Sequence, residues 1–163
     1  MKNLISVSLI RLYGIGASYL VCKDLQQKLE RINKHCILYE DIHMQLISAS
    51  NIKEDELAFV ISYSGITQEI VNMANMIKNN GAKLISITRY DSNQVMSLAD
   101  YKMFVPSIEG IKRISAGSSR ISQMALIDVI YNTYIEKMKI KYADRIIQTR
   151  YLLKKEDKED ENI

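Results

Sequence analysis

The chain of 163 residues is 47% hydrophobic and 25% charged, which is typical of a single soluble domain with a sizeable core. No apolar run approaches the length of about 20 residues that a membrane-spanning helix needs. The net charge is +3, and the last ten residues hold three lysines and five acidic residues, so the rest carries +5. That charge is too small and dispersed to indicate nucleic-acid binding, and it suits a small anionic ligand.

Short apolar runs alternate with helically spaced apolar residues along the chain. Strands are predicted at residues 9–13, 35–40, 57–62, 83–88 and 101–106. Helices are predicted at 18–33, 43–51, 67–80 and 93–100, and from 119 to beyond 138. The alternation predicts a three-layer α/β domain with a five-stranded parallel sheet, right-handed crossovers and flavodoxin-like doubly wound topology. We expect residues 1–150 to form this domain and the charged residues 151–163 to be a disordered tail.

The N-terminal residues and the cysteines indicate the cellular compartment in which the protein is expected. An apolar run follows Lys2, but Arg11 interrupts it and no small-x-small cleavage site follows, so a signal peptide is not favoured and a cytoplasmic location is expected. Cys22 and Cys36 have neither CxxC spacing nor histidine partners at metal-ligand spacing. They are expected to be free thiols in a reducing compartment, and no metal or cofactor is expected.

The segment 61–67, "ISYSGIT", places three hydroxyl side chains where a buried strand passes into a helix. A helix N-terminus has unpaired N–H groups and a partial positive charge, so it binds anions, phosphate above all. Gly65 allows the backbone to approach an anion closely, while Ser62, Ser64 and Thr67 can donate to several phosphate oxygens. Helix capping alone would need one such residue. We therefore interpret this loop as an anion site.

A second loop, "GIGAS" (14–18), follows the first strand and should lie at the same edge of the sheet, near a topological switch point. It matches the first half of the dinucleotide fingerprint G-x-G-x-x-G, and Glu40 and Asp41 follow the second strand, where a ribose-binding carboxylate would lie. However, residue 19 is tyrosine instead of the third glycine. We favour the interpretation that Ser18 faces the same cleft, with phosphate at "SYSGIT" and sugar hydroxyls near Ser18.

The order of the motifs "YGIGAS", "KDLQQKLERI", "FVISYSGITQEI", "GAKLISIT" and "SLAD" resembles a sugar isomerase (SIS) domain. The run "SSRISQMALIDVIYNTYI" makes the chain similar to the SIS domains of the RpiR/MurR group of bacterial transcriptional regulators. The resemblance covers roughly residues 9–138. It implies a phosphosugar-binding, effector-sensing and dimerisation domain of a regulator of carbohydrate metabolism. The site residues that it implies are Gly16, Ser18, Ser62, Tyr63, Ser64, Gly65 and Thr67, with Glu109, Ser118 and Ser119 reaching a site at the dimer interface.

The resemblance also implies a homodimer or tetramer that contacts DNA only through a helix-turn-helix domain. Such a domain precedes the SIS domain in that group, whereas about eight residues precede the first strand here. Either an effector domain has been excised or a DNA-binding part was never present. The predicted last helix fits an oligomer, because its apolar stripe is too wide for one packing face. Asp128 interrupts that stripe and needs a partner on another helix or across a dimer.

The alternative function is a phosphosugar isomerase on the same fold, which needs a general base beside the sugar. His35 begins a strand away from the carboxyl edge, so a structural role is expected for it. His43 follows the second strand and is close enough to be considered, as are the carboxylates Glu40, Asp41 and Glu109. Arabinose-5-phosphate isomerases, which share this fold, carry an "HGDLG"-type stretch where this chain has "DIHMQL". We therefore expect a sensor without a catalytic residue.

Overall fold

The computed structural model describes residues 7–107 and 117–138. Its elements are, in chain order, β1 (Ile10–Tyr13), α2 (Ala17–Arg31), β2 (Cys36–Leu38), α3 (Ile42–Ser50), β3 (Leu57–Ile61), α4 (Gln68–Asn79), β4 (Lys83–Arg89), α5 (Gln94–Leu98), β5 (Tyr101–Val105) and α6 (Gly117–Lys137). Every predicted element is present, and the observed ends lie within two residues of the predicted ones. The predicted continuation of the last helix beyond residue 138 lies outside the described residues.

All five strands are parallel, in the spatial order β2-β1-β3-β4-β5. This is the flavodoxin-like order, so the predicted fold class is confirmed. The chain first adds β2 on one side of β1 and then returns to add β3 on the other side. The direction of winding therefore reverses between β1 and β3, and their carboxyl ends flank the crevice where such sheets bind ligands.

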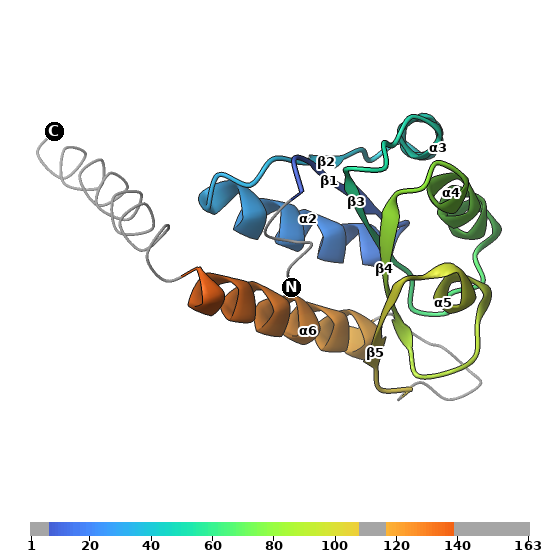
Figure 1. Cartoon of the computed structure of the whole chain (residues 1–163). Helices are drawn as coiled ribbons and strands as arrows, with labels where there is room; N and C mark the ends of the chain where they lie inside the picture. The colour runs from blue at the N-terminus through green and yellow to red at the C-terminus, as the bar shows by residue number, and fades with distance from the viewer. Residues whose placement is uncertain (1–6, 108–116, 139–163) are drawn as a thin grey trace, which may run out of the picture.

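Two apolar cores lie on opposite faces of the sheet, because alternate residues of a strand point to opposite sides. Ile10, Phe59 and Ile87 belong to the core beneath α2 and α6. Tyr13 and other strand residues belong to the second core, beneath α3, α4 and α5. Figure 1 shows these two helical layers with the sheet between them. Within the described part of the chain, no helix is both long enough and apolar enough to cross a bilayer.

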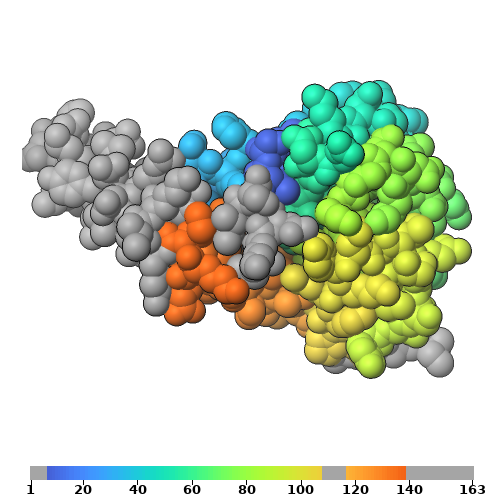
Figure 2. Space-filling view, viewed as in Figure 1, coloured from blue at the N-terminus to red at the C-terminus, as the bar shows by residue number. Residues whose placement is uncertain are grey.

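The helix α6 packs along α2 and leaves apolar side chains outside. Asp128 of α6 accepts from Lys28 Nζ of α2 at 3.0 Å, so the partner predicted for this carboxylate lies on another helix. Ile121 and Val129 are 67% and 61% exposed on the outer side of α6. The space-filling view shows α6 at the surface beside β5 (Figure 2). The apolar stripe is therefore wider than the face that this chain buries.

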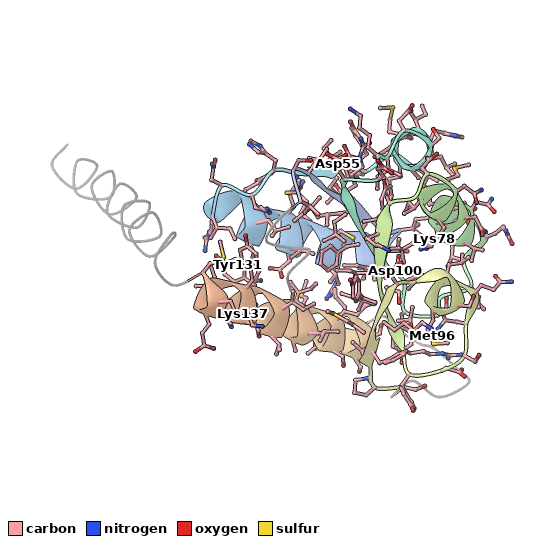
Figure 3. The ribbon with its side chains drawn as sticks, in the orientation of Figure 1. Asp55, Lys78, Met96, Asp100, Tyr131 and Lys137 are labelled. Carbon is pink, nitrogen blue, oxygen red and sulfur yellow. The ribbon has the colours of Figure 1, made fainter. Side chains whose placement is uncertain are left out.

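Two ion-pair clusters connect neighbouring elements. The guanidinium of Arg11 donates to both Glu56 oxygens, at 2.7 and 3.2 Å, where Glu56 is only 5% exposed. In the second cluster, Asp100 accepts from Lys78 Nζ at 2.8 Å and from Lys83 Nζ at 3.2 Å, and Figure 3 shows Lys78 and Asp100 near one another. These side chains join β1 to the segment before β3, and α4 and β4 to the start of β5.

Candidate functional site

A pocket of about 260 Å³ opens between the β1–α2 turn and the β3–α4 loop, which is the switch point of the sheet. The turn contributes one wall and the loop the other. The lining residues are Ile15, Ala17, Ser18, Ile61, Ser62, Tyr63, Ser64, Thr67 and Ile70. Of the predicted site residues, five thus line one pocket. Gly16 and Gly65 lie in the same two loops, where they shape the backbone.

The β3–α4 loop is fixed by bonds to its own residues and to β4. Ser62 Oγ accepts from the Gly65 N–H at 3.2 Å, and the Ser62 N–H donates to the Ile87 carbonyl at 3.0 Å. Gly65 has a φ of 65°, in the left-handed region that favours glycine. Its carbonyl accepts from the N–H of Val95 in α5 at 3.1 Å. The loop therefore has a fixed shape before any ligand arrives.

The N-terminus of α4 is directed at this pocket without a side-chain cap. Thr67 is the N-cap residue, and its hydroxyl makes no capping hydrogen bond. The first N–H groups of a helix lack intrahelical partners, and the helix dipole adds a partial positive charge there. The capping explanation for these hydroxyls therefore fails at Thr67. Its hydroxyl and the adjacent N–H groups are available to an anion.

The N-terminus of α2 reaches the same pocket from the opposite wall. Gly16 is its N-cap residue, with a φ of 59°, and it cannot supply a side-chain cap. Ala17 and Ser18, in the first turn of this helix of 15 residues, line the pocket. Two helix N-termini without side-chain caps thus converge on one cavity. Their combined field favours negative charge even though no charged side chain is among the lining residues.

The hydroxyl side chains of the pocket remain available for hydrogen bonding. Across residues 7–107 and 117–138, no side-chain hydrogen bond engages the hydroxyls of Ser18, Ser64 or Thr67. Ser62 uses an oxygen lone pair for Gly65, so its proton is free to be donated. Tyr63 is different, because its ring is buried and its hydroxyl donates to the Pro106 carbonyl at 3.5 Å. Tyr63 thus connects the loop to the end of β5.

Sequence reasoning missed Gln45 of α3, which holds the β1–α2 turn. Its Oε1 accepts from the Gly14 N–H and its Nε2 donates to the Gly14 carbonyl, both at 3.1 Å. Gln45 is 1% exposed. Its contact spans 31 residues of sequence, so no local pattern indicates it. The one available signal was a polar residue at a position of α3 that faces the core.

The other glycine of the turn, Gly14, is closely packed against α2. A Cβ atom at Gly14 would lie 2.8 Å from Cys22 Sγ and 3.0 Å from the carbonyl carbon and oxygen of Ser18.

Cys22 is fully buried, and this burial raises the pKa of its thiol, which therefore stays protonated. Cys36 is half-buried, and burial with the charge of Glu30 raises its pKa to about 11. Both cysteines are free thiols, as predicted.

Ser118 and Ser119, two of the remaining residues implied by the resemblance, do not line this pocket. Ser118 is exposed in the first turn of α6, and Ser119 is 3% exposed beside it; neither is a lining residue. Glu109 lies outside the described residues. The role predicted for Ser118, Ser119 and Glu109 at an interface therefore remains a prediction.

The groups considered for acid–base or ribose chemistry lie elsewhere. Asp41 caps α3 by accepting from the Met44 N–H at 2.9 Å, and Glu40 beside it is exposed. His43 is exposed in the first turn of α3 and is not a lining residue. His35 is exposed just before β2, and its carbonyl accepts from the Ile10 N–H. What the pocket itself offers is a set of neutral hydrogen-bond donors.

Comparison with known proteins agrees with this geometry. An uncharacterised HTH-type transcriptional regulator of Caldanaerobacter subterraneus is 41% identical over 151 residues, which are 93% of this chain and 51% of that protein. The HTH-type transcriptional regulator RpiR of Escherichia coli is 36% identical over 120 residues, 74% of this chain and 40% of RpiR. The chain therefore spans about half the length, or less, of these curated relatives.

One similar solved structure contains a bound ligand. The NanR protein of Vibrio vulnificus, complexed with ManNAc-6P, superimposes with a TM-score of 0.85 at 28% identity, over 93% of this chain and 57% of the NanR chain. The family model of the SIS domain matches residues 3–133. The family match, the sheet order and the relatives agree with one another: the chain belongs to the SIS domain family, and its similar relatives include HTH-type transcriptional regulators.

Proposed function

We propose that this domain binds a phosphorylated sugar in the pocket at the switch point and serves as the effector-sensing part of a transcriptional regulator of carbohydrate metabolism. One observation carries the proposal: two helix N-termini without side-chain caps, α2 and α4, converge on a pocket lined by four serine and threonine side chains. The likeness to NanR, whose structure holds ManNAc-6P, supports the class of ligand, and the likeness to RpiR supports the role in a transcriptional regulator.

The phosphate would lie at the β3–α4 loop. There the N–H groups at the start of α4 and the hydroxyls of Ser62, Ser64 and Thr67 would donate to its oxygens. Hydrogen bonds to a charged group contribute about 1.5–3 kcal/mol each. A few such bonds can therefore hold the anion without a lysine or arginine. The sugar would extend toward the β1–α2 turn, where Ser18 faces its hydroxyl groups.

The whole regulator would act on DNA through a helix-turn-helix domain, as the names of the relatives suggest. We also propose that the domain is a homodimer or tetramer. The exposed Ile121 and Val129 on the outer side of α6 support a further packing partner. Ser118, Ser119 and Glu109 would then approach a ligand from the subunit interface, and residues 151–163 would be a charged tail outside the folded domain.

The second candidate, a phosphosugar isomerase, would need a general base from beyond the described lining. Glu40, Asp41 and His43 are all exposed, and Glu109 lies outside the described residues. We place sensing first because the pocket presents donors suited to holding a phosphate and because the similar relatives are regulators. The experiment below separates the two candidates by the fate of the ligand.

The test is a thermal-unfolding screen of the chain with ManNAc-6P, glucose 6-phosphate, glucosamine 6-phosphate, inorganic phosphate and nicotinamide cofactors. A ligand at about 100 times its Kd should stabilise the domain by about 2.7 kcal/mol. For a domain of this size, that raises Tm by about 5–10 °C. The bound sugar phosphate is then recovered and identified by NMR.

The outcomes separate the two candidate functions and can refute both. Stabilisation by a sugar phosphate that is recovered unchanged supports the sensor and identifies its effector class. Conversion to a second sugar phosphate makes the protein an isomerase, and His43 and Glu109 become the first residues to substitute. Stabilisation by a nicotinamide cofactor alone, or by none of these compounds, contradicts the phosphosugar proposal.

A further inference from the structure

We infer that Gln45 is a positioning residue that sets the sugar-binding wall of the pocket and so governs selectivity for sugar phosphates over phosphate itself. This inference rests on the proposed function. Gln45 does not line the pocket, so it would act through the backbone of the β1–α2 turn. It belongs to α3, an element that supplies no lining residue.

The contact of Gln45 with the turn is double and buried. The side-chain amide pairs with both backbone groups of Gly14, at 3.1 Å in each direction, and 1% of Gln45 is exposed. A glutamine amide matches this pair of groups because it carries one acceptor and one donor side by side. Losing the amide would leave two backbone groups of Gly14 buried and unpaired. Such groups are costly, so the turn would move to reach other partners.

A shift of Gly14 would also displace the residues of the β1–α2 turn that line the pocket. Gly14 packs so closely on the first turn of α2 that a Cβ atom there would lie 3.0 Å from the backbone of Ser18. The N–H of Ser18 in turn donates to the Ile15 carbonyl at 3.2 Å. Ile15, Ala17 and Ser18 form the turn's side of the pocket. The position of all three therefore depends on how Gly14 is held.

The helix that carries Gln45 is itself anchored to β1. Ser48, one turn further along α3, accepts from Arg11 Nη1 through both its carbonyl and its hydroxyl, at 3.1 Å each. Its hydroxyl also lies 3.3 Å from the Tyr13 hydroxyl, and burial raises the pKa of Tyr13 to about 12, so that phenol stays neutral. α3 is thus a fixed support from which Gln45 can hold the turn.

The opposite wall is held by a separate set of contacts. The β3–α4 loop depends on Ser62, Gly65 and Asn93 and on backbone bonds to Ile87 and Val95. None of these contacts involves Gln45 or Gly14. Removing the Gln45 amide should therefore disturb the β1–α2 turn, which is the proposed sugar wall, and leave the β3–α4 loop, which is the proposed phosphate wall, in place. A general loss of stability would weaken both walls together.

The test compares two kinds of probe, inorganic phosphate and sugar phosphates, on matched variants of this chain. Kd values for inorganic phosphate and for ManNAc-6P, glucose 6-phosphate and glucosamine 6-phosphate are measured well below Tm. The variants are Gln45→Met, which removes both hydrogen bonds, and Gln45→Glu, which keeps the acceptor for the Gly14 N–H. The control is Gln123→Met in α6, because Gln123 is also 1% exposed, its Nε2 has no hydrogen-bond partner among the described residues, and it lies outside the pocket.

We expect Gln45→Met to weaken the binding of the tightest sugar phosphate at least about tenfold and the binding of inorganic phosphate less than about threefold. Gln45→Glu loses the donor to the Gly14 carbonyl and buries a carboxylate beside that oxygen, so its affinity for the sugar phosphate should fall at least as far. Gln123→Met should leave both affinities unchanged. Equal loss for both probes, unchanged affinities, or failure of both Gln45 variants to fold overturns the inference, since Gln45 then acts on the fold as a whole or not at all. A wild-type chain that binds neither probe instead refutes the proposed function.

Discussion

Gly65 lies against the side chain of Asn93 so closely that a Cβ atom at position 65 would overlap Asn93 Oδ1. The Asn93 side chain is held in place by two hydrogen bonds, because its Oδ1 accepts from the Met96 N–H at 2.8 Å and its Nδ2 donates to Thr88 Oγ1 at 3.1 Å. Gly65 also has a positive φ, which side chains disfavour. The loop that forms the proposed phosphate wall is therefore closed to any side chain at this position, for two independent reasons.

Gly65→Ala should consequently both destabilise the domain and abolish sugar-phosphate binding. The new methyl group would displace Asn93 from α5 and strain the backbone, and we expect a loss of about 3 kcal/mol or more in the free energy of unfolding. Urea denaturation measures the stability, and calorimetric titration of the folded variant with the identified sugar phosphate measures binding.

Gly81→Ala is the matched control. Gly81 also has a positive φ, 76°, but a Cβ atom there would meet only Glu54 Cβ, at an ordinary 3.6 Å. Backbone strain alone should cost about 1–2 kcal/mol and leave the affinity unchanged. Equal costs for the two variants would show that contact with Asn93 does not matter at Gly65.

The double variant Ser64→Ala with Thr67→Ala should bind phosphosugar weakly and remain folded. Both hydroxyls face the pocket and neither is engaged in a side-chain hydrogen bond within the described chain, so their loss leaves no buried partner unpaired. Each missing bond to the phosphate should cost about 1.5–3 kcal/mol of binding free energy, which is roughly 10- to 150-fold in Kd. Calorimetric titration gives the affinity, and thermal unfolding without ligand checks the fold.

A second double variant, Ser50→Ala with Thr133→Ala, controls for the loss of two hydroxyls. Ser50 and Thr133 donate to carbonyls of their own helices, of Ile47 and Val129, far from the pocket in sequence and topology. Its affinity should equal that of wild type. If the double variant Ser64→Ala with Thr67→Ala keeps the wild-type affinity for the sugar phosphate, the phosphate does not bind at the β3–α4 loop.

The sheet was predictable because its strands are short apolar runs with clear boundaries. β3 is the clearest case, since all five of its residues are buried and each is apolar in the sequence. The pocket was predictable for a related reason. Parallel strands place their carboxyl ends at one edge, so the serines after β1 and β3 had to lie near one another once the topology was right.

What sequence reasoning missed are polar contacts between residues far apart in the chain. Gln45 reaches Gly14 across 31 positions, and Arg11 reaches Glu56 across 45. Periodicity identifies which face of an element is buried, but it does not identify which polar group meets which inside the protein. Helix ends were imprecise because caps decide them, as Asp41 does for α3.

The pair of Arg11 and Glu56 should be far more important for stability than the pair of Lys28 and Asp128. The former is almost fully buried, with side chains 12% and 6% exposed, whereas Asp128 is 57% exposed. Glu56→Gln leaves the Arg11 charge buried without its countercharge, and we expect a loss of about 3–5 kcal/mol in the free energy of unfolding. Asp128→Asn should cost about 0–1 kcal/mol. Urea denaturation of both variants measures the difference, and similar losses would contradict this assignment.

Asp100 should make the stability depend on pH in the acid range. Burial opposes its ionisation, but hydrogen bonds from Lys78, the Leu84 N–H and Lys83 outweigh burial and lower the pKa of this carboxyl from 3.8 to about 2. A carboxyl with a lower pKa in the folded state stabilises the protein above its unfolded pKa. That contribution should be complete above about pH 4 and disappear as the pH falls toward about 2.

Asp100→Asn should therefore cost about 1–3 kcal/mol at pH 7, and its difference from wild type should shrink steadily between about pH 4 and pH 2. Urea denaturation across this range measures both effects. Asp55→Asn is the control, because Asp55 is exposed and accepts only from Ser8 Oγ at 3.2 Å among the described residues, so the substitution should change stability little at any pH. A difference for Asp100→Asn that stayed constant down to pH 2 would mean that the charge of Asp100 does not stabilise the fold, and that its role is confined to the neutral hydrogen bonds that asparagine can also make.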